Sequence, residues 1–84
     1  MDSKAFKIAE RKAFSRIFRE LFEKEDITQT YFCQLSGVNK YRMYDYLNAR
    51  AFPNGSDFDK IVKYFGYTFD EFWDMLDAEI EKER

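Results

Sequence analysis

The sequence predicts an all-α fold of five helices in one domain that spans residues 1–84. Apolar residues recur at every third or fourth position, and no segment alternates at period two for long enough to be a strand. Capping residues and glycines separate the helical segments. Phe, Tyr and Trp make up 20% of the chain, and because each ring buries a large area, they are expected to form its core.

The first helix is predicted over residues 3–25, where no Gly or Pro interrupts the helical spacing. Residues 1–12 form its N-terminal extension, which is rich in Lys and Arg. The apolar positions of the whole helix are Phe6, Ala9, Ala13, Phe14, Ile17, Phe18, Leu21 and Phe22.

Two short helices are predicted next. Thr28 can cap a helix over residues 29–36, and Gly37 can end it in the left-handed conformation. Asn39 can cap a third helix that runs to about Arg50. On that helix, Met43 and Leu47 lie four residues apart and make the inner stripe, with polar residues left for the other faces.

The last two helices follow a loop at residues 52–55. Ser56 and Asp59 form a cap-like pair at the start of the fourth helix, which ends at Gly66. Thr68 and Glu71 match a capping box that starts the fifth helix. Residues 77–84 are the acidic end of that helix.

Several classes of function are excluded or disfavoured by what the composition lacks. There is no His, and Cys33 is the one cysteine, so we expect no catalytic triad, no metal site and no disulfide. Three glycines leave no phosphate-binding loop, and no cofactor is expected. We expect no membrane span and no signal peptide, because no apolar run is long enough for either. We therefore expect a cytoplasmic protein that is not an enzyme and does not bind membranes.

The net charge of −2 and the sequence pI of about 5.1 hide a gradient along the chain. Residues 1–24 carry seven bases and four acids, residues 25–50 carry three of each, and residues 51–84 carry four bases and nine acids. A chain with this distribution can present a basic face and an acidic face at once. The low pI therefore does not exclude a nucleic-acid partner.

An eight-residue helix, a glycine turn and a second helix make the helix-turn-helix arrangement, here predicted at helices 2–3. The order of all five helices resembles the lambda-repressor-like family, the Cro/repressor type of DNA-binding regulator. The resemblance covers roughly residues 14–76. It is carried by Thr28-Gln29, Phe32-Cys33, Gly37-Val38, Pro53, Phe58, Ile61-Val62, Phe65-Gly66, Thr68 and Glu71.

The resemblance implies a compact domain that places its third helix in the major groove of double-stranded DNA. It implies base contacts from four residues, namely Lys40, Tyr41, Tyr44 and Asp45. It implies contacts with the DNA backbone from six more, namely Gln29, Thr30, Asn39, Arg42, Asn48 and Arg50. Asn39 can equally serve only as a helix cap.

The chain departs from the family pattern at three positions. Cys33 stands where members usually have Ala, and we expect it to be a small core residue. Ala49 stands where members often have Gly after the third helix, which leaves the local backbone geometry open. Phe22 stands where members often have an Arg that joins a buried ion pair, so an apolar contact is expected there.

Both ends of the chain carry features that the family core does not need. Trp73, Leu76 and Ile80 form a stripe on the fifth helix that is expected to be exposed and to act as a homodimer interface. The alternative is that the stripe belongs to the core of the domain. The N-terminal extension either adds a phosphate contact or a dimer arm, or is a solvated helix that packs Phe6 on the core.

Two functions are compatible with these features. The first is a sequence-specific DNA-binding transcriptional regulator, a dimeric repressor of phage or mobile-element type. The second is a protein-binding module on the same fold, antitoxin-like or a phage-encoded inhibitor, that acts through its acidic fifth helix. The polar residues of the third helix favour the first function, and the acidic helix favours the second.

Overall fold

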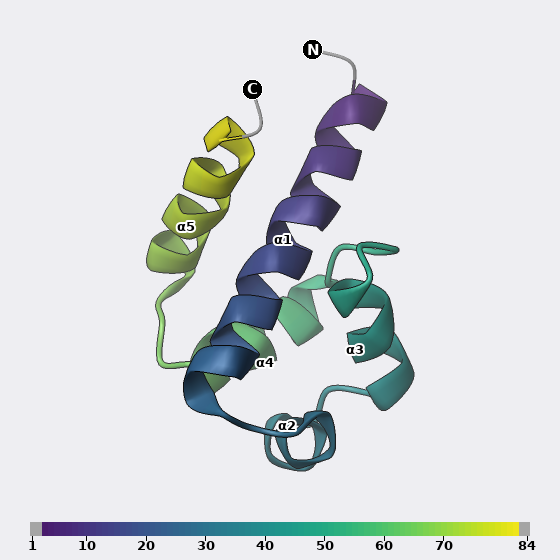
Figure 1. Ribbon diagram of the computed structural model, residues 1–84, viewed down its shortest axis with the longest axis vertical. Coiled ribbons are helices and arrows are strands. Elements are labelled where there is room, and N and C mark those ends of the chain that lie inside the picture. Colours follow the sequence, from purple (N-terminus) through teal and green to yellow (C-terminus); the bar gives the residue numbers. More distant parts are fainter. Residues whose placement is uncertain (1–2, 83–84) are drawn as a thin grey trace.

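Five α-helices and no strand make up the described residues, 3–82, of this computed structural model (Figure 1). They are α1 (Ser3–Glu25), α2 (Gln29–Ser36), α3 (Lys40–Leu47), α4 (Gly55–Tyr64) and α5 (Phe69–Lys82). Residues 1–2 and 83–84, the outer ends of the predicted extension and acidic segment, lie outside the described residues. The all-α prediction is confirmed, and none of the described helices could cross a bilayer.

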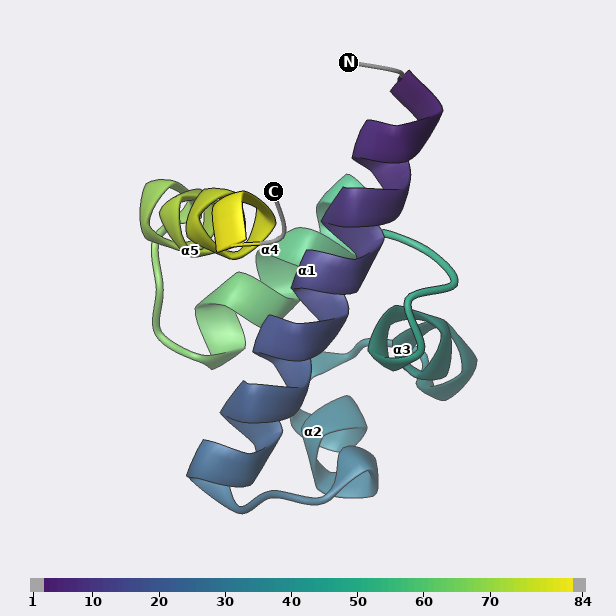
Figure 2. The same cartoon turned by 45° about the horizontal axis from the view of Figure 1, so that its top comes forward.

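The long helix α1 organises the domain. It packs against α5 on one side and α3 on the other, so that these two helices lie on opposite sides of α1 in both views (Figures 1 and 2). An ion pair joins α1 and α5, with Arg16 Nε 3.7 Å from Glu79 Oε1. The first turns of α1, drawn in purple, extend past the other helices in Figure 2.

Aromatic rings form the centre of the core, as the composition predicts. Phe14 is fully buried, and its ring centroid lies 5.3 Å from that of Phe18, 5.5 Å from that of Phe52 and 5.7 Å from that of Phe72. The ring of Phe22 packs on Phe18 and on the buried Phe32 of α2. Edge-to-face and offset ring contacts at these distances are favourable beyond the area that they bury.

Three of the predicted helix starts are confirmed. The Thr28 side chain accepts a hydrogen bond from the Tyr31 amide at 3.1 Å, and Asn39 Oδ1 accepts from the Tyr41 amide at 2.9 Å. The capping box of α5 is complete: Thr68 Oγ1 accepts from the Glu71 amide, and Glu71 Oε1 accepts from the Thr68 amide. These oxygens satisfy backbone N–H groups that have no partner inside a helix.

The predicted cap of the fourth helix is wrong by two residues. Asn54 caps α4, since its Oδ1 accepts a hydrogen bond from the Asp57 amide at 2.8 Å. Ser56 lies inside the first turn of the helix. Because Asn and Ser are both good N-caps, their identity alone did not decide which of them starts the helix.

The third helix ends at Leu47, earlier than the predicted Arg50, because Ala49 adopts the left-handed conformation with φ of 58°. The Ala49 amide donates to the Tyr46 carbonyl at 3.3 Å, and the Arg50 amide donates to the Asp45 carbonyl at 2.9 Å. This pair of bonds is a Schellman ending, which usually has Gly at the left-handed position. Gly66 occupies the equivalent position after α4, with φ of 80°.

Replacing Ala49 by Gly should stabilise the protein, because the left-handed conformation brings an alanine Cβ too close to the following carbonyl. We expect a net gain of about 0.5–1 kcal/mol in the free energy of unfolding, measured in urea. This value already includes the opposing effect of Gly, which raises the entropy of the unfolded chain. As a control, Ala78→Gly on the exposed part of α5 should cost about 1 kcal/mol. Equal losses for the two variants would contradict the strain assigned to Ala49.

Candidate nucleic-acid interface

The two sides of α3 differ sharply in exposure. Met43, Tyr46 and Leu47 are between 0% and 4% exposed, so one side of the helix is part of the core. On the other side, Tyr41 is 79% exposed and Tyr44 is 50% exposed. The helix therefore presents a fixed outer surface of polar and aromatic groups.

A buried carboxylate holds α3 against α4. Asp57, at the start of α4, is 1% exposed. The Arg42 guanidinium donates to it twice, from Nε to Oδ2 at 2.7 Å and from Nη2 to Oδ1 at 3.3 Å. The Tyr46 hydroxyl also donates to Oδ2, at 2.5 Å. All three side chains are thereby positioned by one another, which fixes the rotation of α3 about its axis.

The hydrogen-bond partners change the acidity of this cluster. Burial alone would raise the pKa of Asp57, but the hydrogen bonds from Arg42 and Tyr46 and the positive charge of Arg42 outweigh it and lower that pKa. Burial, together with the hydrogen bond to Asp57, raises the pKa of Tyr46 to about 12. At neutral pH the cluster therefore contains an ionised carboxylate, a neutral phenol and a charged guanidinium.

Polar side chains of α1 hold the other end of α3. The Leu47 carbonyl accepts hydrogen bonds from Ser15 Oγ at 2.5 Å and from Arg19 Nε at 2.9 Å. Arg19 Nη2 also lies 3.3 Å from Asn48 Oδ1. The carbonyls at the end of a helix lack intrahelical partners and carry partial negative charge, so a guanidinium is a favourable partner there.

Several of the predicted contact residues come together on the outer surface. A pocket of about 260 Å³ is lined by Gln29 from the first turn of α2 and by Lys40, Tyr41 and Tyr44 from α3. Thr30 is also exposed in the first turn of α2, and Asp45 is partly exposed on α3. The Arg50 guanidinium carbon lies 5.5 Å from the centre of the Tyr44 ring, a cation–π distance.

Three other predicted contact residues bond to the protein itself. Asn39 Oδ1 caps α3, which is the alternative that the sequence left open. Arg42 is engaged with Asp57. Asn48 Nδ2 donates to the Tyr44 carbonyl at 2.8 Å, while its oxygen faces Arg19. Their visible role is to position α3.

Sequence reasoning missed Arg11, Ser15, Arg19 and Asp57 as residues that position the site. A signal was present in α1, because a serine among apolar residues, with an arginine four positions to each side, places three polar groups on one face. No comparable signal marked Asp57, since an acid in the first turn of a helix is ordinary. The apolar contact expected at Phe22 is confirmed, since its ring packs on those of Phe18 and Phe32.

The predicted exposure of the α5 stripe is wrong. Leu76 is fully buried, Ile80 is 7% exposed and Trp73 is partly buried, with its ring 5.8 Å from that of Phe52. These side chains pack inside the domain because α5 lies against α1. Phe6, whose packing on the core was one alternative for the N-terminal extension, is 40% exposed and is not among the residues that pack against the core.

Comparison of the chain with models of protein families, with curated proteins and with solved structures finds no match in any of the three.

Replacing Asp57 by Asn should destabilise the fold by about 1–3 kcal/mol at pH 7, because the charged hydrogen bonds from Arg42 are weakened. A carboxyl whose pKa is lowered on folding stabilises the protein above its unfolded pKa, about pH 4, and loses this effect as the pH falls through the folded value. The difference between the two proteins in urea unfolding should therefore shrink between pH 5 and pH 2.

Asp59→Asn is the matched control, because Asp59 pairs with the exposed Lys63 at 3.0 Å and such surface pairs contribute little. A loss for Asp57→Asn that is the same at pH 2 and pH 7 would contradict a role for the ionised carboxylate.

Proposed function

We propose that this protein is a sequence-specific DNA-binding transcriptional regulator that inserts α3 into the major groove. One observation carries the proposal: α3 is held on its inner side by apolar packing and by Asp57, while Lys40, Tyr41 and Tyr44 remain exposed on its outer side. A B-DNA major groove is wide enough for an α-helix. The order and length of α2 and α3, joined by residues 37–39, support a helix-turn-helix.

The outer side chains have the chemistry that base recognition needs. Lys40 can donate to guanine O6 or N7, and Asp45 can accept from a cytosine amino group. Tyr41 and Tyr44 present ring surfaces that can contact a thymine methyl group. Gln29, Thr30 and Arg50 flank this surface and can bind phosphates, which set the register of the protein on DNA without reading sequence.

The position of the negative charge also supports DNA binding. Most of the acids of residues 51–84 lie on α5, and α5 is on the opposite side of α1 from α3 (Figures 1 and 2). Repulsion between an acid and a phosphate falls off within about 10 Å at 0.1 M salt. The acidic helix therefore need not prevent α3 from approaching a duplex.

Selection from a random pool of duplex DNA, repeated at 50 mM and 200 mM salt, tests this function directly. We expect one enriched sequence. A palindrome whose half-sites lie about one helical turn apart would indicate a dimer, and a single half-site would indicate a monomer. No enrichment at either salt concentration would contradict sequence-specific DNA binding.

The double variant Lys40→Ala with Tyr41→Ala should weaken binding to the selected duplex by at least about tenfold, because two base contacts are lost. Both side chains are exposed, so the free energy of unfolding should change by less than about 0.5 kcal/mol. Fluorescence anisotropy and urea unfolding measure the two quantities.

Two further variants serve as controls for that experiment. Lys63→Ala removes one positive charge from α4 and should leave binding unchanged. Arg42→Ala should instead lower stability, because it leaves the buried Asp57 with one partner fewer. Binding that survives the Lys40 and Tyr41 changes would contradict the placement of α3 in the groove.

A second candidate function rests on the outer face of α5. Asp70, Asp74 and Asp77 are exposed there, at positions that share one face of the helix. An acidic face is suited to a basic protein partner, as an antitoxin-like module or a phage-encoded inhibitor would need. The selection experiment separates the two functions. A DNA-binding regulator should enrich one duplex sequence, whereas a module that binds only a protein should enrich none.

A further inference from the structure

The N-terminal part of α1 carries positive charge that the interface described above does not use. Residues 3–8 are all exposed, and Lys4, Lys7, Arg11 and Lys12 fall within the first ten residues of the helix, against one acid, Glu10. This segment extends past the rest of the domain in Figure 2. It therefore has a surface that is open to a partner.

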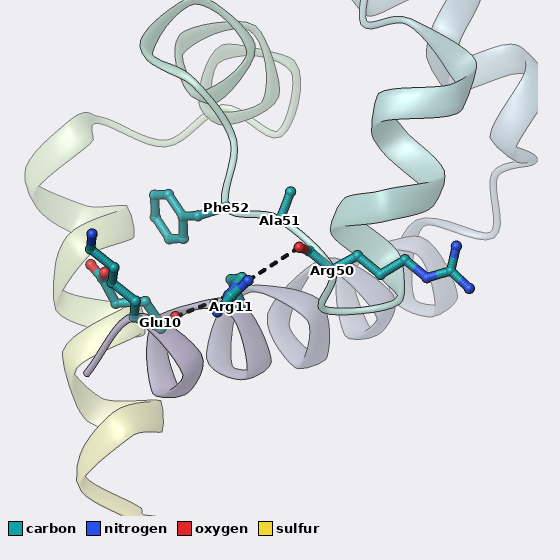
Figure 3. Close-up of a pocket in the computed structure, with 6 residues that line it drawn as sticks. Glu10, Arg11, Arg50, Ala51 and Phe52 are labelled. Carbon is teal, nitrogen blue, oxygen red and sulfur yellow. Dashed lines mark hydrogen bonds between the residues drawn. The ribbon is translucent and has the colours of Figure 1, made fainter. Parts of the chain in front are cut away.

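This basic segment is continuous with the outer surface of α3. Lys7, Arg11 and Arg50 line one pocket of about 400 Å³, together with Glu10, Ala51 and Phe52. Arg11 Nη1 donates to the Arg50 carbonyl at 3.3 Å, while the Arg50 side chain extends away from Arg11 (Figure 3). Since the Arg50 guanidinium lies over the Tyr44 ring, one surface runs from α3 through Arg50 to Lys7.

We propose that the N-terminal part of α1 binds the phosphate backbone of DNA that flanks the site read by α3, with Lys7 as the main contact. This inference rests on the proposed DNA-binding function. Ser15 touches the last residue of α3, and Lys7 lies eight residues before it, a rise of about 12 Å along α1. That distance corresponds to about three to four base pairs of duplex.

A duplex fits this surface better than a second copy of the chain does. Phe6 and Ile8 are the exposed apolar residues of the segment, but residues two apart lie on nearly opposite faces of a helix, so they do not form one apolar seam. The acidic face of α5 could attract the basic segment of a second copy through charge alone. The continuity of the basic segment with α3 favours DNA over this alternative.

The test uses the full chain and the selected duplex, with the phosphates that flank the site either native or replaced by neutral methylphosphonates. Lys7→Gln should reduce the magnitude of the slope of log K against log salt by about 0.9. The ratio of wild-type affinity to variant affinity should therefore be about 3.5-fold larger at 50 mM salt than at 200 mM salt. With neutral flanks, Lys7→Gln should bind as tightly as wild type.

Two further variants test whether the charge of this pocket, rather than the total charge of the protein, controls binding. Glu10→Gln removes a negative charge from the same pocket and should strengthen binding to the native duplex. Lys63→Gln, which removes a positive charge from α4, should behave as wild type on both duplexes.

Each other outcome overturns the inference. Specific binding that ignores both Lys7 and the flanking phosphates refutes it and leaves the proposed function intact. Loss of self-association with Lys7→Gln in sedimentation, without a change in the salt slope, assigns the segment to a second copy instead. If no duplex is selected at all, the proposed function fails and the inference fails with it.

Discussion

The carboxylate of Asp57 is almost completely removed from water, and the placement of α3 depends on it. Removing a charged group from water is costly unless charged hydrogen bonds replace its hydration. Arg42 and Tyr46, both from α3, supply those bonds, so α3 can satisfy the carboxylate in only one rotation about its axis. The exposure of Tyr41 and Tyr44 on the outer side follows from that rotation.

The last residue of α3 is also held by hydrogen bonds, but here the donor and acceptor roles are exchanged. Here the helix supplies the acceptor, the Leu47 carbonyl, and α1 supplies the donors, Ser15 and Arg19. A surface that reads bases must be positioned closely, because hydrogen-bond recognition tolerates little displacement. The polar contacts with Asp57 and with α1, together with the contact between the Phe14 and Tyr46 rings, give α3 a rigid support.

The net charge of −2 describes this protein poorly, because opposite charges occupy different places. Acids collect on α5, while the outer side of α3 and the start of α1 carry Lys40, Arg50 and Lys7. Few phosphates can be neutralised by so few cations, so affinity that comes from counterion release is small. The proposed function would therefore depend more on contacts with bases than binding by a strongly basic protein does.

The sequence alone is enough to predict the helices, because apolar spacing and caps such as Thr28 and Asn39 act within a few residues of the chain. It also indicated the exposed residues of α3, since the helical period separates them from Met43 and Leu47. The burial of Leu76 and Ile80, and the ion pair between Arg42 and Asp57, became clear only from the packing of the helices. Those outcomes depend on which helix lies against which face, and residues 15 or more positions apart carry no local pattern that records it.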